Sequence, residues 1–272
     1  MKEKILLLLL SFISFNCPVM AQGNLMIFPK RIAFDGIQNR MQIINLSNVG
    51  KDTATYKMSY NQIKMDEDGN FISIEEPEPN QRFASSYLRF YPRTITLAPN
   101  GSQTVKIQLI KTNELQQGEY RSHLYFRAVP KNKVLGNEET THKPDGLNIS
   151  IKPVFGISIA NIITIGETSV AVTLSNLEIQ HSEEEIILSL DFNRSGSSSC
   201  YGDIQVNHIS ATGITTSAAT LKGFAVYAPG NLRRTKIKLI ATSNIDYTKG
   251  QLQVIYSTQD KGIKYAEASL RL

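Results

Sequence analysis

Cysteine and tryptophan are almost missing from this sequence of 272 residues, which holds two cysteines and no tryptophan. Cys17 lies in an N-terminal segment that we expect to be removed, so Cys200 would have no partner for an internal disulfide. The basic residues are scattered rather than clustered, and the formal net charge is only +5. Without a basic stripe and interleaved stacking aromatics, the sequence does not predict a nucleic-acid partner.

Long apolar runs are also missing beyond the N-terminus. Residues 1–21 join an early basic stretch, an apolar run at residues 5–15 and small residues near Ala21, which is the pattern of a secretory signal peptide. No other stretch approaches the roughly 20 apolar residues of a transmembrane helix. We therefore expect cleavage after Ala21 and an exported mature chain without a membrane span. Acylation at Cys17 is the alternative, but the preceding Phe15 and Asn16 are not the small residues usual at such a site.

Residue patterns that carry catalysis or bind metals are not found. The histidines show no ligand spacing, the acidic run at residues 183–185 is typical of a solvated turn, and Cys200 follows three serines without a nearby histidine. There is no Gly-x-Ser-x-Gly elbow, phosphate loop or dinucleotide fingerprint. We expect no cofactor, no metal and no enzymatic activity. The four histidines are His123, His142, His181 and His208.

Short strand-like segments, separated by turn residues, fill the rest of the chain. About seven such segments before residue 130, with turns every 8 to 12 residues, are typical of an immunoglobulin-like sandwich. Similar segments recur after residue 168, so we predict an all-β chain with domains at residues 22–163 and 164–272, although one large β domain of this length would not be abnormal. The clearest segments are residues 26–29, 31–34, 41–46, 55–60, 94–97, 103–109, 120–129, 169–174, 185–190, 203–206, 236–239 and 251–256.

The segment at residues 147–163 joins the two predicted domains and shows the clearest strand signal. Leu147, Ile149 and Ile151 alternate with polar residues, so they share one face of an extended chain. Pro153 cannot donate to a sheet ladder, which favours a strand with one open edge. Taken alone, such a strand is more often part of a core than of a binding site.

Several motifs, taken in order, resemble the periplasmic pilus chaperones of the chaperone-usher family, which are PapD-like proteins. The second half looks like the archaic or alternative branch of that family. The resemblance implies two immunoglobulin-like β-sandwich domains in a boomerang arrangement. The motifs lie at residues 29–36, 91–105, 118–124, 201–204 and 226–234.

The resemblance also implies a function. A pilus subunit lacks its last strand, and the chaperone lends one of its own, with backbone hydrogen bonds and alternate side chains filling the open groove. Here Leu147, Ile149 and Ile151 would be the donor residues, each contributing roughly 1.5 to 3 kcal/mol on burial. The expected partners are pilus or fimbrial subunits and an outer-membrane usher, and the expected location is the periplasm.

In the family, two basic residues hold the C-terminal carboxylate of the subunit and so fix the register of the donated strand. Arg31 matches the first of them. Gly156 occupies the expected position of the second, and Lys152, which shares its side-chain parity, is the nearest substitute.

Two other functions stay open at this point. The chain could be a secreted or surface protein of the same ancestry that works in adhesion or in the envelope without pilin clients. A secreted β-sandwich hydrolase is a further alternative, but no acid or nucleophile cluster supports it. The sequence identifies neither the client nor the oligomeric state, and residues 131–146 could cover the open edge through self-association.

Overall fold

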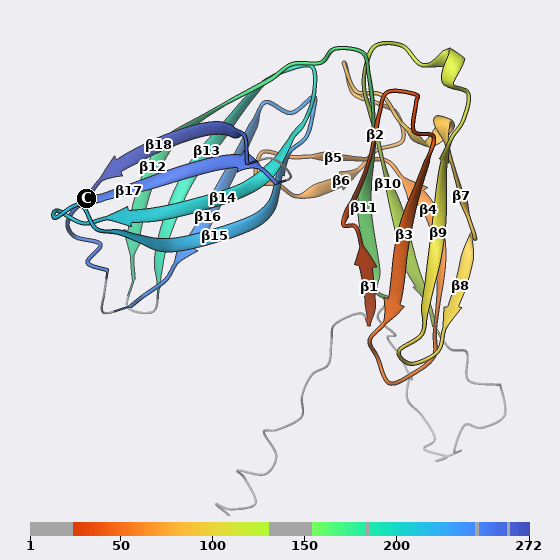
Figure 1. Cartoon of the computed structure of the whole chain (residues 1–272), viewed down its shortest axis with the longest axis horizontal. Helices are drawn as coiled ribbons and strands as arrows, with labels where there is room; N and C mark the ends of the chain where they lie inside the picture. Colours follow the sequence, from red (N-terminus) through yellow and green to blue (C-terminus); the bar gives the residue numbers. More distant parts are fainter. Residues whose placement is uncertain (1–23, 131–153, 183–184, 243–244, 260–261) are drawn as a thin grey trace, which may run out of the picture.

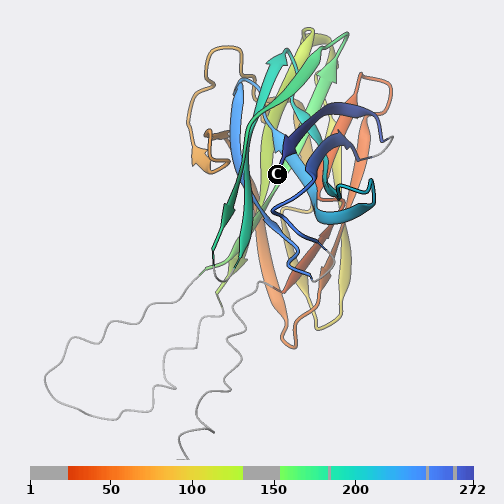
Figure 2. The ribbon, with the colours of Figure 1, turned by 90° about the vertical axis from the view of Figure 1, so that its left-hand side faces the viewer.

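The computed structural model describes residues 24–130, 154–182, 185–242, 245–259 and 262–272. Its regular structure is almost entirely β-strand, arranged in two sandwiches whose long axes are strongly inclined to one another (Figure 1). Figure 2 views the molecule from the side of the second sandwich, which lies in front of the first. The prediction of an all-β chain with two inclined sandwich domains is confirmed.

The first sandwich consists of a four-stranded and a five-stranded sheet. The four-stranded sheet runs in the order β1 (Leu25–Phe28), β3 (Met41–Asn48), β9 (Ser102–Leu109) and β7 (Leu88–Tyr91). The five-stranded sheet runs in the order β2 (Arg31–Asp35), β11 (Gly156–Ile165), β10 (Gly118–Val129), β4 (Ala54–Asn61) and β8 (Thr94–Leu97). Alternate apolar residues of both sheets, such as Ile44, Ile107 and Phe126, are fully buried between them, as the period of two requires.

The second sandwich has a separate core of its own. One sheet runs in the order β12 (Val170–His181), β13 (Ile186–Gly196) and β16 (Leu232–Leu239). The other runs in the order β15 (Thr215–Val226), β14 (Cys200–Ile209), β17 (Gln251–Thr258) and β18 (Lys264–Arg271). Phe192, Phe224 and Tyr256 form its aromatic centre, with ring centroids 4.4 to 6.0 Å apart.

Strand β11 is not an edge strand along its whole length, which corrects the expectation drawn from Pro153. Residues 160–164 pair with β10 on one side and in parallel with Arg31–Asp35 of β2 on the other. Residues 156–159 pair with β10 alone among the described strands. The reason is that the first strand of the chain is divided at Pro29 and Lys30, with β1 in one sheet and β2 in the other. The open edge is therefore confined to the beginning of β11.

A hairpin of the first domain, β5 (Ile63–Met65) and β6 (Phe71–Ser73), extends toward the second domain (Figure 1). Its turn forms because the Asp66 carboxylate accepts hydrogen bonds from the backbone N–H of Asp68 at 3.0 Å and of Asn70 at 2.7 Å. Two short 3₁₀ helices, Ser85–Tyr87 and Thr112–Glu114, complete the regular structure of the described residues. That part of the chain contains no helix with the length and apolar character needed to cross a membrane.

Candidate functional site

The two domains meet along the outer face of β11. Ala160 and Ile162, which are 4% and 1% exposed, pack against Ala225 and Tyr227 of the second domain. The alternate residue Ile163 points into the core of the first domain. Both faces are buried over residues 159–163, where Asn161 is the one polar residue, so this part of the strand does not alternate between apolar and polar residues.

An arginine of the first domain is stacked on a tyrosine of the second at the centre of the junction. The Arg121 guanidinium lies 4.4 Å from the centre of the Tyr227 ring, and its Nη2 donates to the Ala228 carbonyl at 3.1 Å. Arg121 is only 3% exposed, and burial lowers the pKa of its guanidinium. Burial likewise raises the pKa of the Tyr227 hydroxyl, so this contact is a cation on a neutral ring.

His123 lies beside this pair and is 2% exposed. Its ring is 5.4 Å from that of Phe71 and 5.7 Å from that of Tyr227, and neither ring nitrogen has a hydrogen-bond partner among the described residues. Burial, together with the charge of Arg121, lowers the pKa of His123 to about 3. The ring is therefore neutral near pH 7 and acts as part of the packing.

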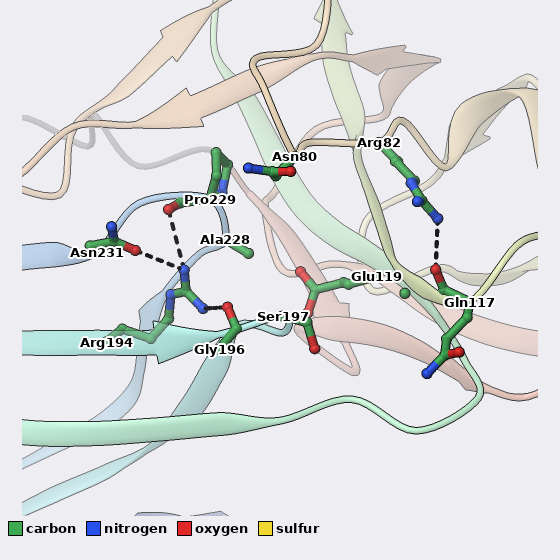
Figure 3. Close-up of a pocket in the computed structure, with 11 residues that line it drawn as sticks. Asn80, Arg82, Gln117, Glu119, Arg194, Gly196, Ser197, Ala228, Pro229 and Asn231 are labelled. Carbon is green, nitrogen blue, oxygen red and sulfur yellow. Dashed lines mark hydrogen bonds between the residues drawn. The ribbon is translucent and has the colours of Figure 1, made fainter.

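One side of the junction is a polar cleft of about 420 Å³, which we call the Arg194 cleft (Figure 3). Of its two basic residues, Arg194 has all its hydrogen-bond donors bound by the protein itself. Arg194 is 4% exposed, and it donates to the carbonyls of Gly196, Ser198, Pro229 and Gly230 and to Oδ1 of Asn231. The cleft is lined by Asn80, Arg82, Gln117, Gly118, Glu119, Arg194, Gly196, Ser197, Ala228, Pro229 and Asn231.

The acid in the Arg194 cleft also has its partners. The Glu119 carboxylate, on β10 of the first domain, accepts hydrogen bonds from the backbone N–H and the hydroxyl of Ser199 in the second domain. The same Ser199 oxygen accepts the N–H of Ala228 at 2.9 Å. The Glu119–Ser199 contacts connect the two domains. Glu119 and Arg194 both have their hydrogen-bond partners within the protein, so neither needs a ligand to be satisfied.

The tip of the β5–β6 hairpin makes a further contact between the domains. The Glu67 carboxylate lies 2.7 Å from Nη2 of Arg234, and the Arg234 backbone N–H donates to the Glu67 carbonyl at 2.6 Å. Gly69 lies so close to Arg233 that an added side chain would displace that guanidinium. The turn at residues 66–70 therefore belongs to the domain junction, which its turn-like sequence did not reveal.

Arg31 lies in a second cleft, of about 650 Å³, which we call the Arg31 cleft. The guanidinium is 4.7 Å from the centre of the Tyr201 ring, and its buried Nε has no hydrogen-bond partner among the described residues. The lining contains three basic residues and no acidic one. It consists of Phe28, Pro29, Lys30, Arg31, Ala33, Tyr201, Lys222, Gly223 and Gln259.

Of the site residues predicted from the sequence, Arg31 is the one that the structure describes. Leu147, Ile149, Ile151 and Lys152 lie outside the described residues.

Gly156, the expected position of the second basic residue, begins β11. A side chain added there would run into the ring of Tyr125 on the neighbouring strand and displace it. A basic residue at this position would therefore need the tyrosine to move.

The sequence did not single out Arg121, Tyr227 or Lys222 as junction residues. Tyr227 and Tyr201 stood in motifs of the resemblance, but the arginines that stack on them are more than one hundred positions away in the chain. Nothing in a single sequence pairs such distant residues.

Cys200 begins β14 and is fully buried. Its Sγ lies 3.8 Å from the carbonyl oxygen of Val226, and burial raises the pKa of the thiol. This environment suits a small core residue rather than a nucleophile. In the described part of the chain, no three histidine, cysteine, aspartate or glutamate residues are grouped as metal ligands.

Comparisons with protein-family models and with curated proteins give no match for this chain. Solved structures similar to it include the YadV chaperone, at 12% identity and a TM-score of 0.44, covering 92% of this chain and 100% of that one. The class 5 fimbriae chaperone CfaA has 16% identity, a TM-score of 0.41, and coverage of 91% and 98%. In the pre-assembly complex of the chaperone CsuC with the tip adhesion subunit CsuE, from archaic Csu pili of Acinetobacter baumannii, the matched chain has 9% identity, a TM-score of 0.44, and coverage of 90% and 96%. The similarity is one of fold alone.

Proposed function

We propose that the protein is a periplasmic chaperone that binds pilus or fimbrial subunits by lending them a strand and delivers them to an outer-membrane usher. The observation that carries this proposal is the open edge at the beginning of β11. Residues 156–159 pair on one side only among the described strands, and the Ala128 N–H donates to the Phe155 carbonyl at 2.9 Å, so pairing with β10 continues upstream. An open strand edge is a template for an added strand.

The side-chain parity at this edge supports the same reading. Ile157 and Ile159 face the core of the first domain. In an unbroken strand, residues at even spacing share one face, so Leu147, Ile149 and Ile151 would continue that apolar face upstream. When a subunit pairs with this edge, the open groove of the subunit would be filled by the odd-numbered residues Leu147, Ile149 and Ile151.

The first test compares two double variants on the same strand. Ile149→Asp with Ile151→Asp places charge on the proposed donor face, whereas Asn148→Asp with Ser150→Asp places the same charge on the opposite face. Each mature chain is produced in a periplasm with candidate secreted subunits from the same genome, and one-to-one complexes are isolated. We expect the first pair to lose capture by at least tenfold, since two buried apolar contacts are removed, and the second pair to retain it.

Equal capture by both double variants would contradict strand donation. Recovery of the protein at the cell surface with no subunit bound would instead favour the structural or adhesion function. Usher delivery is tested separately, by asking whether a captured subunit passes to a purified usher from the same genome.

Arg31 has a defined part in this proposal. Arg31 is the first residue of β2 and pairs with Ala160, directly after the open edge at residues 156–159, and this position supports its assignment to the C-terminal carboxylate of the subunit. Lys152 remains a predicted second partner.

A further inference from the structure

The Arg31 cleft is shared by the two domains. Phe28, Lys30 and Arg31 come from the first domain, whereas Tyr201 and Lys222 come from β14 and β15 of the second. The resemblance places both carboxylate-binding residues on strands of the first domain. The structure brings a different cation, Lys222, into the same cleft from the second.

A β-bulge determines where Lys222 lies. Between the pairs Gly202↔Phe224 and Ile204↔Leu221, the single residue Asp203 stands opposite the two residues Lys222 and Gly223. Such a bulge breaks the alternation of a strand and redirects a side chain. Gly223 has φ +71, a conformation that suits glycine, and its N–H donates to Oδ1 of Asp203 at 2.9 Å.

The bulge is in contact with the ring on which Arg31 stacks. A Cβ added to Gly223 would come within 2.9 Å of the Tyr201 hydroxyl, so the bulge, Tyr201 and the Arg31 guanidinium form one continuous group. The Asp203 carboxylate, which accepts the Gly223 N–H, also accepts a hydrogen bond from Gln259 at 3.3 Å. It is on β14, opposite the bulge, and is not among the residues that line the cleft.

We infer that Lys222, in place of the predicted Lys152, is the second carboxylate-binding residue, so that a client's C-terminus is held by one cation from each domain. This inference rests on the proposed function. A carboxylate has two oxygens and can accept from two cationic groups at once. Because Lys222 and Arg31 belong to different domains, a bound carboxylate would also bridge the domain junction.

The test uses the ¹⁵N-labelled mature chain and two probes, the tripeptide N-acetyl-valyl-threonyl-valine as its free acid and as its C-terminal amide. Binding is followed through the Arg31 Nε–H and Gly223 backbone N–H signals. We expect the free acid to shift both signals and the amide to shift neither. Lys222→Gln should weaken binding of the free acid by about five- to tenfold, as expected for loss of one charge-assisted hydrogen bond, and Lys222→Arg should restore most of it.

Lys236→Gln is the matched control, since Lys236 is an exposed lysine of the same domain on β16. It should bind the free acid as the parent does. A Lys222→Gln variant that binds as tightly as the parent would overturn the inference. Equal shifts with inorganic phosphate and with the tripeptide acid would also overturn it, because the cleft would then be a general anion site. Neither result affects the capture experiment on Ile149 and Ile151, so the two proposals fail separately.

Discussion

Each of the two clefts at the domain junction contains an arginine, and the two arginines differ in how their hydrogen-bond donors are used. In the Arg194 cleft, the guanidinium donates to five oxygen atoms of its own domain, and Glu119 is bound to Ser199. In the Arg31 cleft, the guanidinium is stacked on a ring and its Nε has no partner among the described residues. The Arg194 donors are all used within the fold, whereas Arg31 lines a cleft with two other basic residues and no acidic one, which suits it to binding an anion.

The largest expected effect is at Arg194. Arg194→Leu would leave several buried carbonyls without donors, and we expect it to lower the free energy of unfolding by at least about 3 kcal/mol. Arg31→Leu loses one ring contact and should cost no more than about 1 kcal/mol. Urea denaturation of both variants measures the difference. Equal losses would mean that Arg31 is as structural as Arg194, and the contrast between the clefts would disappear.

His123 extends the comparison between the two clefts, because its ring nitrogens have no hydrogen-bond partner among the described residues and yet the ring is buried. Its folded pKa of about 3 lies below the ordinary value of 6.5, so between these values the unfolded chain binds a proton that the folded chain does not. Stability should therefore decrease as the pH falls, by about 2 kcal/mol between pH 6.5 and 5 from this residue alone.

The measurement is urea denaturation at pH 6.5 and 5 for the parent, His123→Met and the exposed control His181→Gln. We expect the methionine variant to lose most of this pH dependence and the control to keep it. A pH dependence unchanged in His123→Met would show that the buried ring is not its source.

The smallest effect is expected at the hairpin tip. Glu67 and Arg234 are 57% and 52% exposed in their side chains, so solvent screens their ion pair. Glu67→Gln should change the free energy of unfolding by no more than about 0.5 kcal/mol. A double-mutant cycle with Arg234→Gln, followed by thermal unfolding, isolates the pair. A coupling above about 1 kcal/mol would make the hairpin a principal tie between the domains.

The fold class could be predicted from the sequence because strands and turns leave local signals in it. Alternation in β3, β9 and β17 and the turn at residues 66–70 can be read within a few positions. The sequence did not single out β15, where two register shifts break the alternation. The same bulge that hides the strand from sequence inspection is the one that brings Lys222 to the cleft.

The candidate site could be predicted only in part. Arg31 lies within the motif at residues 29–36, but Tyr201 and Lys222 come close to it only through the packing of one domain on the other. At position 156, the ring of Tyr125 on the neighbouring strand leaves no room for a side chain unless the ring moves. Contacts of this kind follow from tertiary packing, which spacing along one chain does not encode.

Strand β11 has an open edge in its first part and lies at the domain junction in its second part. Its first residues offer an edge for pairing, and its last residues are wedged between the first core and the second domain through Ile163 and Ile162. A shift of this strand by one position would turn Ile163 toward the second domain and Ile162 toward the first core, so neither side chain would keep its packing. The domain junction therefore fixes the register of β11, and under the proposed function it would also fix the register of a strand that pairs with its open edge.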